Sequence, residues 1–412
     1  MEQVSKKLWN KDFSLVALCN AIALLGNMTL TFALAYYVLD ITGSEAMFGL
    51  ALSVTYIPLL VMNPIAGIMA DRLRKQRIMF WIDISVVALI LVYMAVYGHV
   101  VSALPIVFVK LLALNAIQGA YMSTTQAAVP LVVPAEKLAS GNALMGMVNA
   151  LVGAGGQALA AVLFSRFGLT PILIIFAVVY GITAIMDLFI RVPYTKQEAA
   201  DSIFQLVKND MAQAIRFAVK EKPVLAKFSV VIFVFGTSVV SLLIVGGPVL
   251  IVQTLGMDLG FVGIVQIFIA IGGIAGGVTA GALGSRLTIR ATPLILMIIC
   301  ILPIPMGLAI MFNLPTMVIF VVITAVFALI MLVNTIFMVA AMTFVQTETP
   351  ALLLGKVLGL LSMLPILEQA LGQFVFGVLF EAFADMSWVV VFIAVGVAAV
   401  AAVYSRRVAR EV

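Results

Sequence analysis

The stretch AGIMADRL at residues 66–73 recurs as AGALGSRL at residues 280–287, 214 residues further along the chain. A second match, Pro134-Ala135 with Pro350-Ala351, has nearly the same spacing of 216 residues. Two independent matches at almost one offset predict that the chain consists of two homologous halves. We expect these halves at residues 1–190 and 224–412, joined by the polar stretch 191–223.

Composition indicates that both halves lie in a membrane. Of the 412 residues, 64% are hydrophobic and 10% are charged, whereas a soluble domain carries about 25% charged residues. A bilayer span needs about 20 mostly apolar residues, and six apolar stretches of this kind occur in each half. They fall at about 12–39, 45–70, 78–98, 103–131, 135–166, 170–190, 224–255, 259–284, 291–312, 315–345, 351–383 and 386–405. We therefore predict an all-α membrane protein with twelve transmembrane helices, which excludes a soluble enzyme and a nucleic-acid-binding protein.

The charges predict the orientation of the chain in the membrane. With the N-terminus in the cytoplasm, every Lys and Arg except Lys110 and Arg166 falls on the cytoplasmic side or in the linker. The opposite loops hold acids instead: Asp40, Glu45, Asp258, Glu381 and Asp385. Basic residues prefer the cytoplasmic side of membrane proteins. We expect a multi-pass protein of the bacterial cell membrane with both termini in the cytoplasm, and topology explains the pI near 9.2 without an acidic partner.

The polar stretch between the halves contains one amphipathic pattern. Its apolar positions, which share one helical face, are Ile203, Val207, Met211, Ile215 and Ala218. Such a pattern is typical of a helix lying at the membrane surface. Two readings remain open, a passive tether between the halves and a regulatory element.

The pattern Gly67-x-x-x-Asp71-Arg72-x-x-Lys75, with Arg74 and Arg77 adjacent, resembles the signature of the major facilitator superfamily between its second and third helices. Other stretches resemble the drug:proton antiporter branch that contains the macrolide-efflux proteins: 25–27, 42–44, 77–83, 130–138 and 354–357. The resemblance implies the major facilitator fold, two six-helix pseudo-repeats that alternate access to a central cavity. It also implies a secondary transporter rather than an enzyme.

The signature supplies a candidate cytoplasmic gate. Asp71 is placed to face the positive N-terminal end of another helix, and Arg72 and Arg74 can pair with Asp83 or Glu136. The gate motif therefore comprises Gly67, Asp71, Arg72, Arg74, Lys75 and Asp83. The alternative, that these charges only set the topology, stays open.

Four ionisable residues fall inside the predicted spans, namely Asp83, Lys110, Asp187 and Glu368. A charge at the centre of a membrane helix costs about 2.5–3.5 kcal/mol on insertion scales, so such residues are functional candidates. Asp187 lies four residues before Arg191, and we expect the two to form a structural helical pair.

Glu368 is the candidate proton-coupling residue. It lies near the middle of a predicted helix over residues 351–383, and Gln369 and Gln373 flank it. Related antiporters often carry a carboxylate on the first helix where this chain has Asn27, so proton coupling here depends on Glu368. A protonated glutamate with a purely structural hydrogen bond is the alternative. Lys110 has two readings, either reaching the cavity to balance Glu368 or snorkelling outward to water.

In the superfamily, helices 1, 4, 7 and 10 line the cavity, and their polar residues here are mostly amides and methionines. Together with the neighbours of Glu368, the candidate substrate-cavity residues are Asn27, Thr31, Lys110, Asn115, Gln118, Met122, Asn334, Met338, Gln369 and Gln373. Neutral amides and flexible methionines suit an apolar, variable ligand.

We therefore predict a proton-coupled exporter of amphipathic or hydrophobic compounds, drug-like or macrolide-like. A lipid (lysophospholipid) or siderophore exporter or flippase of the same fold is the alternative. The expected partners are the small substrate, protons and membrane lipids, and the expected state is a monomer. We expect no nucleic acid, cofactor or metal, since Cys19 and Cys300 lie in apolar stretches and His99 is the sole histidine. A Walker sequence, which ATP-driven transport would require, is missing from the chain.

Overall fold

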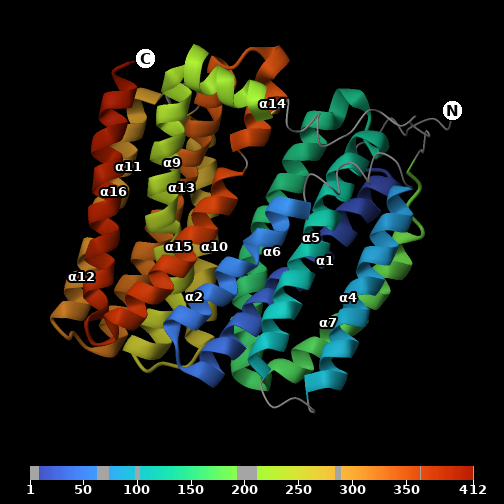
Figure 1. Ribbon diagram of the computed structural model, residues 1–412, viewed down its shortest axis with the longest axis horizontal. Coiled ribbons are helices and arrows are strands. Elements are labelled where there is room, and N and C mark those ends of the chain that lie inside the picture. The colour runs from blue at the N-terminus through green and yellow to red at the C-terminus, as the bar shows by residue number, and fades with distance from the viewer. Residues whose placement is uncertain are drawn as a thin grey trace. The chain divides into compact units, whose positions relative to one another are not determined.

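The computed structural model describes residues 9–62, 74–97, 103–192, 211–283, 289–361 and 363–411. These residues are mostly helical and contain no β-strand (Figure 1). Helices before residue 193 are α1 (Lys11–Thr42), α2 (Glu45–Val54), α4 (Lys75–Tyr97), α5 (Ala103–Val132), α6 (Leu138–Phe167) and α7 (Leu169–Asp187). Helices after residue 210 are α9 (Pro223–Ser241), α10 (Gly260–Leu283), α11 (Thr292–Ile301), α12 (Ile304–Met311), α13 (Thr316–Glu348), α14 (Ala351–Leu361), α15 (Leu364–Ala382) and α16 (Ser387–Ala409).

Short helices of other types connect or extend these elements. The 3₁₀ segments are Ala135–Lys137, Ile289–Ala291 and Ala384–Met386, and the π-helical segments are Phe217–Glu221, Leu242–Gly246 and Val249–Thr254. The last two π segments continue α9, so the span beginning at Pro223 widens toward its end.

Twelve helical stretches of the described residues are long and apolar enough to cross a membrane. They correspond to the twelve stretches predicted from the sequence, so the all-α, twelve-helix prediction is confirmed. The span over residues 289–311 is interrupted, since Pro303 separates α11 from α12 and proline cannot donate the backbone hydrogen bond that would continue a helix. The stretch predicted over residues 351–383 corresponds to α14 and α15, and Lys356–Ala382 is counted as one of the twelve spans. Residue 362, between these two helices, lies outside the described residues.

Glycine ends two of the long helices. Gly43 follows α1 with φ of 63°, and its N–H donates to the Leu39 carbonyl oxygen at 2.8 Å. Gly168 joins α6 to α7 with φ of 68°. Positive φ is strained for residues with a Cβ atom, so these glycines allow the chain to reverse direction at the two turns.

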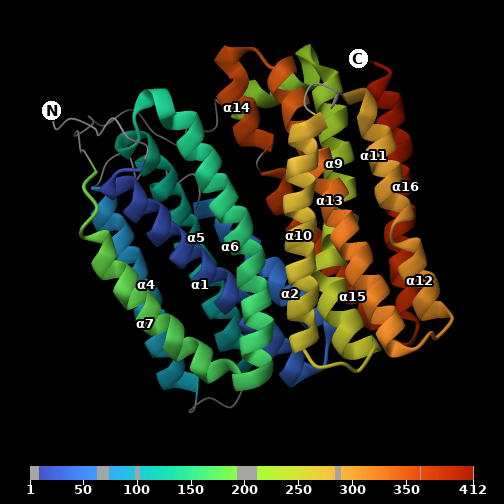
Figure 2. The ribbon, with the colours of Figure 1, turned by 180° about the vertical axis from the view of Figure 1, so that it is seen from behind.

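The helices form two compact units. Of the described residues, 9–43 and 54–192 belong to the first unit, and 44–53 and 211–411 to the second. In the first unit, α1 packs against α5, α6 and α7, and α4 packs against α5 and α7 (Figure 2). In the second unit, α9 packs against α15 and α16, α10 against α13, and α11 against α16. Residues 203–210 of the predicted linker helix lie outside the described residues.

Within the second unit, α2 packs closely on α15. A Cβ atom at Gly49 or Gly377 would overlap the backbone of the other helix, so the contact depends on both glycines. The Glu381 carboxylate accepts hydrogen bonds from the Ser44 hydroxyl and from the Ala46 N–H, the latter at 3.0 Å. A carboxylate at a helix N-terminus satisfies free N–H groups and suits the helix dipole. Glu381 thus fixes the start of α2.

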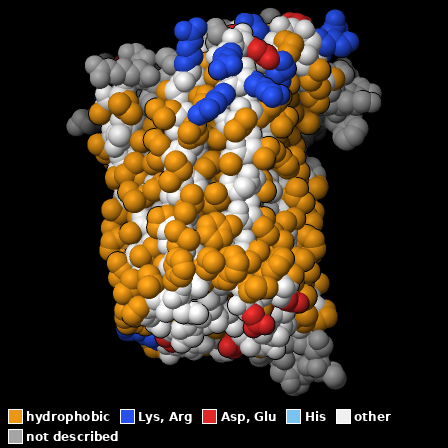
Figure 3. Space-filling view, turned by 90° about the vertical axis from the view of Figure 1, so that its left-hand side faces the viewer, with side chains coloured by type: hydrophobic (Ala, Val, Ile, Leu, Met, Phe, Trp, Pro, Cys, Tyr) orange, Lys and Arg blue, Asp and Glu red, His pale blue; other side chains and the backbone are white. Residues whose placement is uncertain are grey.

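Charged side chains lie at the ends of the helices of the second unit. Figure 3 shows a broad band of apolar side chains, with Lys and Arg side chains gathered beyond one edge and acidic side chains mostly beyond the other. Asp385 is exposed just before α16, whereas Arg406 and Arg407 are exposed in its last turn. The two kinds of charge are therefore separated by the length of a membrane-spanning helix.

Candidate functional site

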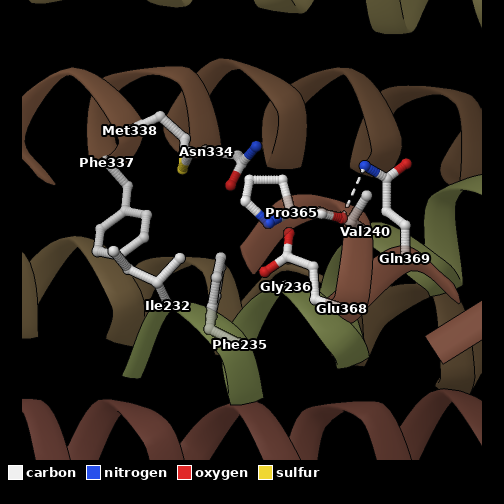
Figure 4. A pocket seen from close by; sticks show the side chains of 10 residues that line it. All are labelled: Ile232, Phe235, Gly236, Val240, Asn334, Phe337, Met338, Pro365, Glu368 and Gln369. Carbon is white, nitrogen blue, oxygen red and sulfur yellow. Dashed lines mark hydrogen bonds between the residues drawn. The ribbon is translucent and has the colours of Figure 1, made fainter. Parts of the chain in front are cut away.

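A cavity of about 190 Å³ lies among α9, α13 and α15 in the second unit (Figure 4). Its walls contain one carboxylate and two amides among apolar side chains. The lining residues are Ile232, Phe235, Gly236, Val240, Asn334, Phe337, Met338, Pro365, Glu368 and Gln369. Four of these were predicted as site residues, namely Asn334, Met338, Glu368 and Gln369.

The carboxylate belongs to Glu368, four residues after the start of α15. Pro365 lies in the first turn of α15, three residues before Glu368, and both belong to the span Lys356–Ala382. Glu368 is only 5% exposed, and its Oε2 atom has no hydrogen-bond partner among the described residues. A buried carboxylate oxygen without a donor is costly, so it is free to take a proton or a cationic group.

Gly236 on α9 leaves the space that the carboxylate occupies. A Cβ atom at this position would overlap all three atoms of the Glu368 carboxylate group. Further along the same pair of helices, Gly372 of α15 lies against Thr237 and Ser241 of α9, again closer than a Cβ atom allows. Small residues therefore bring α9 and α15 into close contact and hold the carboxylate at the cavity wall.

The rest of the cavity is apolar with two amides. Phe235 and Phe337 pack with their ring centroids 5.3 Å apart, and Ile232 and Met338 lie beside Phe337 in Figure 4. The Gln369 Nε2 atom donates to the Pro365 carbonyl oxygen at 3.2 Å. Sequence reasoning missed the aromatic residues and Gly236, because an apolar residue in a membrane helix carries no signal that separates cavity from lipid or core.

The other predicted cavity residues include a group in the first unit, on α1 and α5. Thr31 and Asn115 are joined by a hydrogen bond of 3.3 Å from the asparagine amide. Asn27 is buried, and neither polar atom of its side chain has a hydrogen-bond partner among the described residues. The Gln118 amide nitrogen also has no hydrogen-bond partner among the described residues. Met122 is half-buried. Gln373 of the second unit is buried on α15 outside the cavity lining.

Lys110 is buried in the first unit and does not snorkel. Its side chain is 1% exposed, and Nζ lies 4.1 Å from the centroid of the Tyr93 ring on α4. Within the described part of the chain, no acid forms an ion pair with it. A cation–π contact partly replaces the lost hydration. The reading of Lys110 as a residue that reaches outward to water is therefore wrong.

Part of the predicted gate motif lies outside the described residues, namely Gly67, Asp71 and Arg72. Arg74 is exposed, Lys75 is buried at the start of α4, and Asp83 is buried two turns further on. No ion pair joins Arg74 to Asp83 among the residues that the structure describes. The role of the motif as a gate stays a prediction.

Asp187 does not pair with Arg191. Helix α7 ends at Asp187, so Arg191 is not one helical turn away on the same helix, and its backbone N–H donates to the Asp12 carboxylate at 2.8 Å. Asp187 is fully buried, and the side chains of Cys19 and Tyr121 face it. The predicted helical pair is wrong because the helix ends four residues before Arg191.

Twelve helices of membrane-spanning length and an internal cavity with a buried carboxylate define a polytopic membrane transporter by class. Residues 16–365 match the family model of the Major Facilitator Superfamily. The chain belongs to this superfamily, as the signature residues predicted.

Two curated relatives are similar to part of this chain. Macrolide efflux protein A of Streptococcus pyogenes is 26% identical to this chain over 189 residues, which are 45% of this chain and 46% of that protein. The protein of the same name from Streptococcus pyogenes serotype M6 matches to the same extent. The match spans about half the length of these relatives.

Solved structures of transporters share the fold at low identity. A bacterial homologue of the human lysosomal transporter Spinster has a TM-score of 0.73 at 14% identity and covers 98% of each chain. The nucleoside transporter NupG has a TM-score of 0.70 at 18% identity over 97% of this chain and 99% of its own. A bacterial homologue of the iron transporter ferroportin has a TM-score of 0.69 at 15% identity over 97% and 98%. These likenesses establish the fold and leave the substrate open.

Proposed function

We propose that the protein is a secondary active exporter that moves amphipathic compounds carrying a basic group out of a bacterial cell in exchange for protons. The observation that carries this proposal is the Glu368 carboxylate in an otherwise apolar cavity. The similarity of about half the chain to macrolide efflux protein A supports the direction of transport and the class of compound.

The cavity is lined by both apolar and polar side chains, which suits an amphipathic ligand. The rings of Phe235 and Phe337, with Ile232 and Met338, suit a hydrophobic body, and Asn334 and Glu368 suit a basic group. Drug sites generally measure about 300–1,000 Å³. A cavity of about 190 Å³ therefore holds only the part of such a ligand that carries the charge.

Glu368 supports proton exchange because one carboxylate can serve two cations in turn. When ionised, it attracts the basic group of the substrate, and when protonated it loses that attraction. Binding of a proton therefore releases the substrate, and binding of the substrate releases the proton. This competition links the two movements, provided that the transporter opens to each side in turn.

We place the protein in the bacterial cell membrane with both termini in the cytoplasm. The exposed arginines at the end of α16 and the exposed acid at its start support this orientation, because basic residues favour the cytoplasmic side.

The test uses purified protein in liposomes with an imposed pH gradient. We expect uptake or release of a macrolide and of other amine-bearing amphiphiles to follow the gradient, and we expect Glu368→Gln to lose gradient-driven movement at least tenfold. Glutamine keeps the shape of the side chain but can neither ionise nor exchange a proton. Asp385→Asn is the matched control, since Asp385 is exposed at the start of α16 and lies outside the cavity.

Equal gradient-driven transport by Glu368→Gln and the unchanged protein would contradict the role of Glu368. A lysophospholipid and a siderophore are tested in the same liposomes. If one of these moves and the amine-bearing compounds do not, the substrate class proposed here is wrong and the alternative of lipid or siderophore export takes its place.

A further inference from the structure

Two buried aspartates lie on neighbouring helices of the first unit, and neither lines the cavity described above. Asp83 lies on α4 and Asp187 is the last residue of α7, and these two helices pack against each other. Both residues are 0% exposed. Their carboxylates are close enough to interact electrostatically.

No basic side chain neutralises this pair within the described part of the chain. Both oxygens of Asp83 lack a hydrogen-bond partner there, and the ion pairs found there all belong to the second unit. Lys110, the basic residue of α5, lies 11 residues before Tyr121, about 16 Å along the helix at 1.5 Å per residue. On α6 the basic residue Arg166 lies in the last turn, next to the start of α7, whereas Asp187 ends α7.

The groups that do face the pair are weak acids from each neighbouring helix. Cys19 of α1 and Tyr121 of α5 lie beside Asp187, and Tyr121 and Tyr180 also interact with Asp83. The Tyr180 hydroxyl donates to the Ala23 carbonyl oxygen at 2.7 Å and is therefore engaged. The buried Tyr121 hydroxyl has no hydrogen-bond partner in the described chain, so it is available to the carboxylates.

Two ionised carboxylates in this setting would place two unbalanced negative charges inside a membrane protein. Charges of one sign that share a buried site cannot both persist, and one of them takes up a cation. A hard metal ion needs about six to eight oxygen ligands. No group of three or more His, Cys, Asp or Glu residues in the described ranges is arranged to hold one. The proton is the cation that this pair can bind.

We propose that Asp83 and Asp187 form a second proton-binding site, which holds one exchangeable proton between the two carboxylates. Asp83 carries the proton, because it lies within α4, two turns from the helix start, and neither of its oxygens has a hydrogen-bond partner in the described chain. Asp187 is the last residue of α7, and its oxygens likewise have no hydrogen-bond partner there. It is the carboxylate that ionises, and the Cys19 thiol and the Tyr121 hydroxyl beside it can donate to it. The use of this proton in transport rests on the function proposed above, whereas the binding of the proton does not.

The test is infrared spectroscopy of the purified full-length protein in lipid, titrated from acid to alkaline conditions. Isotopic labelling of the aspartate carboxyl carbons separates aspartate bands from the band of Glu368. We expect one labelled carbonyl band of a protonated, buried carboxylic acid near neutral pH. Asp83→Asn should abolish this band, and Glu368→Gln should leave it unchanged.

Two further variants keep the proposal testable if Asp83→Asn does not fold. Asp187→Asn removes the neighbouring negative charge, so the Asp83 band should persist but disappear at lower pH. Tyr121→Phe removes a donor from Asp187, so the band should disappear at higher pH. A labelled band that is missing from the folded protein, or unmoved by both variants, would overturn the proposal, as would its loss on adding sodium at constant pH.

Transport measurements in the same preparations separate this proposal from the preceding one. If the labelled band behaves as expected but gradient-driven export is unaffected by Glu368→Gln, the second proton site stands and the proposed function fails. If the second proton site and the proposed function are both supported, Asp83→Asn should lower the number of protons moved per substrate molecule. Substrate binding at Glu368 should be retained.

Discussion

Glu368 and Gly236 lie on different helices, and the carboxylate of the first fills the space left by the missing Cβ atom of the second. The sequence indicated Glu368, because an acid in the middle of an apolar stretch is rare and costly. It gave no reason to choose Gly236, because the partner of a membrane-helix glycine depends on which helices meet. Charged residues in membrane spans are thus predictable, whereas the small residues that make room for them are not.

Gly236→Ala should disturb the site directly. The added methyl group displaces the Glu368 carboxylate or separates α9 from α15, and we expect a loss of gradient-driven transport of about tenfold, or about 1.4 kcal/mol. The free energy of unfolding should fall by about 1–3 kcal/mol, as for other overpacked sites. Gly277→Ala on α10 is the control, since a Cβ atom there meets nothing within 4 Å. Normal transport by Gly236→Ala would show that the carboxylate does not need its present position.

Lys110 provides a second residue-scale prediction. An unpaired lysine in a membrane helix costs about 2.5–3.5 kcal/mol, and a cation–π contact returns about 0.5–2 kcal/mol. Replacing it with the similarly long, uncharged methionine should therefore raise the free energy of unfolding by about 1–2 kcal/mol, measured by thermal unfolding in detergent. Lys137→Met, at an exposed position, should leave it unchanged. Destabilisation by Lys110→Met would indicate that the lysine has a partner in the native protein.

At the scale of helices, the interruption between α11 and α12 was not predicted. The apolar run over residues 291–312 predicted one helix, and apolarity is indeed continuous across Pro303. Hydropathy cannot detect an interruption inside a span, since the residues on both sides remain apolar. Pro303 was the available signal, because a proline inside a helical pattern marks the start of a new segment more often than its interior.

The contribution of the contact between α2 and α15 to stability can be tested by placing a larger side chain at Gly377. A Cβ atom at Gly377 would lie 2.7 Å from the Glu45 carbonyl oxygen, so Gly377→Val should separate the two helices. We expect the free energy of unfolding to fall by about 1–3 kcal/mol, measured by thermal unfolding. Gly396→Val on α16 is matched in chemistry and meets nothing within 4 Å. If the two variants unfold alike, the close approach of α2 and α15 does not contribute to stability.

At the scale of the whole chain, the sequence predicted the twelve helices and the family well. Both depend on averages over many residues, namely apolar length and the spacing of a repeated motif, and such averages tolerate local errors. The grouping of residues 44–53 with the described residues from 211 to 411 could not be read from the sequence. It depends on packing between segments more than 300 residues apart, which no local pattern records.

The orientation makes a prediction for the whole chain. Both native cysteines are buried, so they are replaced by alanine, and single cysteines are introduced as Asp385→Cys and Arg290→Cys, two exposed positions. In intact cells, a membrane-impermeant thiol reagent should label the first variant and not the second. Permeabilised cells should show labelling of both. The reverse pattern in intact cells would place the termini outside.

The hydrogen bond from Ser44 to Glu381 joins positions 337 residues apart. During translation, residues 44–53 enter the membrane when most of the chain has not been made, and α15 is among the last helices to follow. Domains usually fold as they emerge, N-terminal parts first. Here the face of α2 that carries Gly49 has no partner until α15 is made, after the synthesis of almost all the other spans. The N-terminal half therefore cannot complete its native contacts on its own, and a nascent chain released before residue 370 would leave that face open to other membrane proteins.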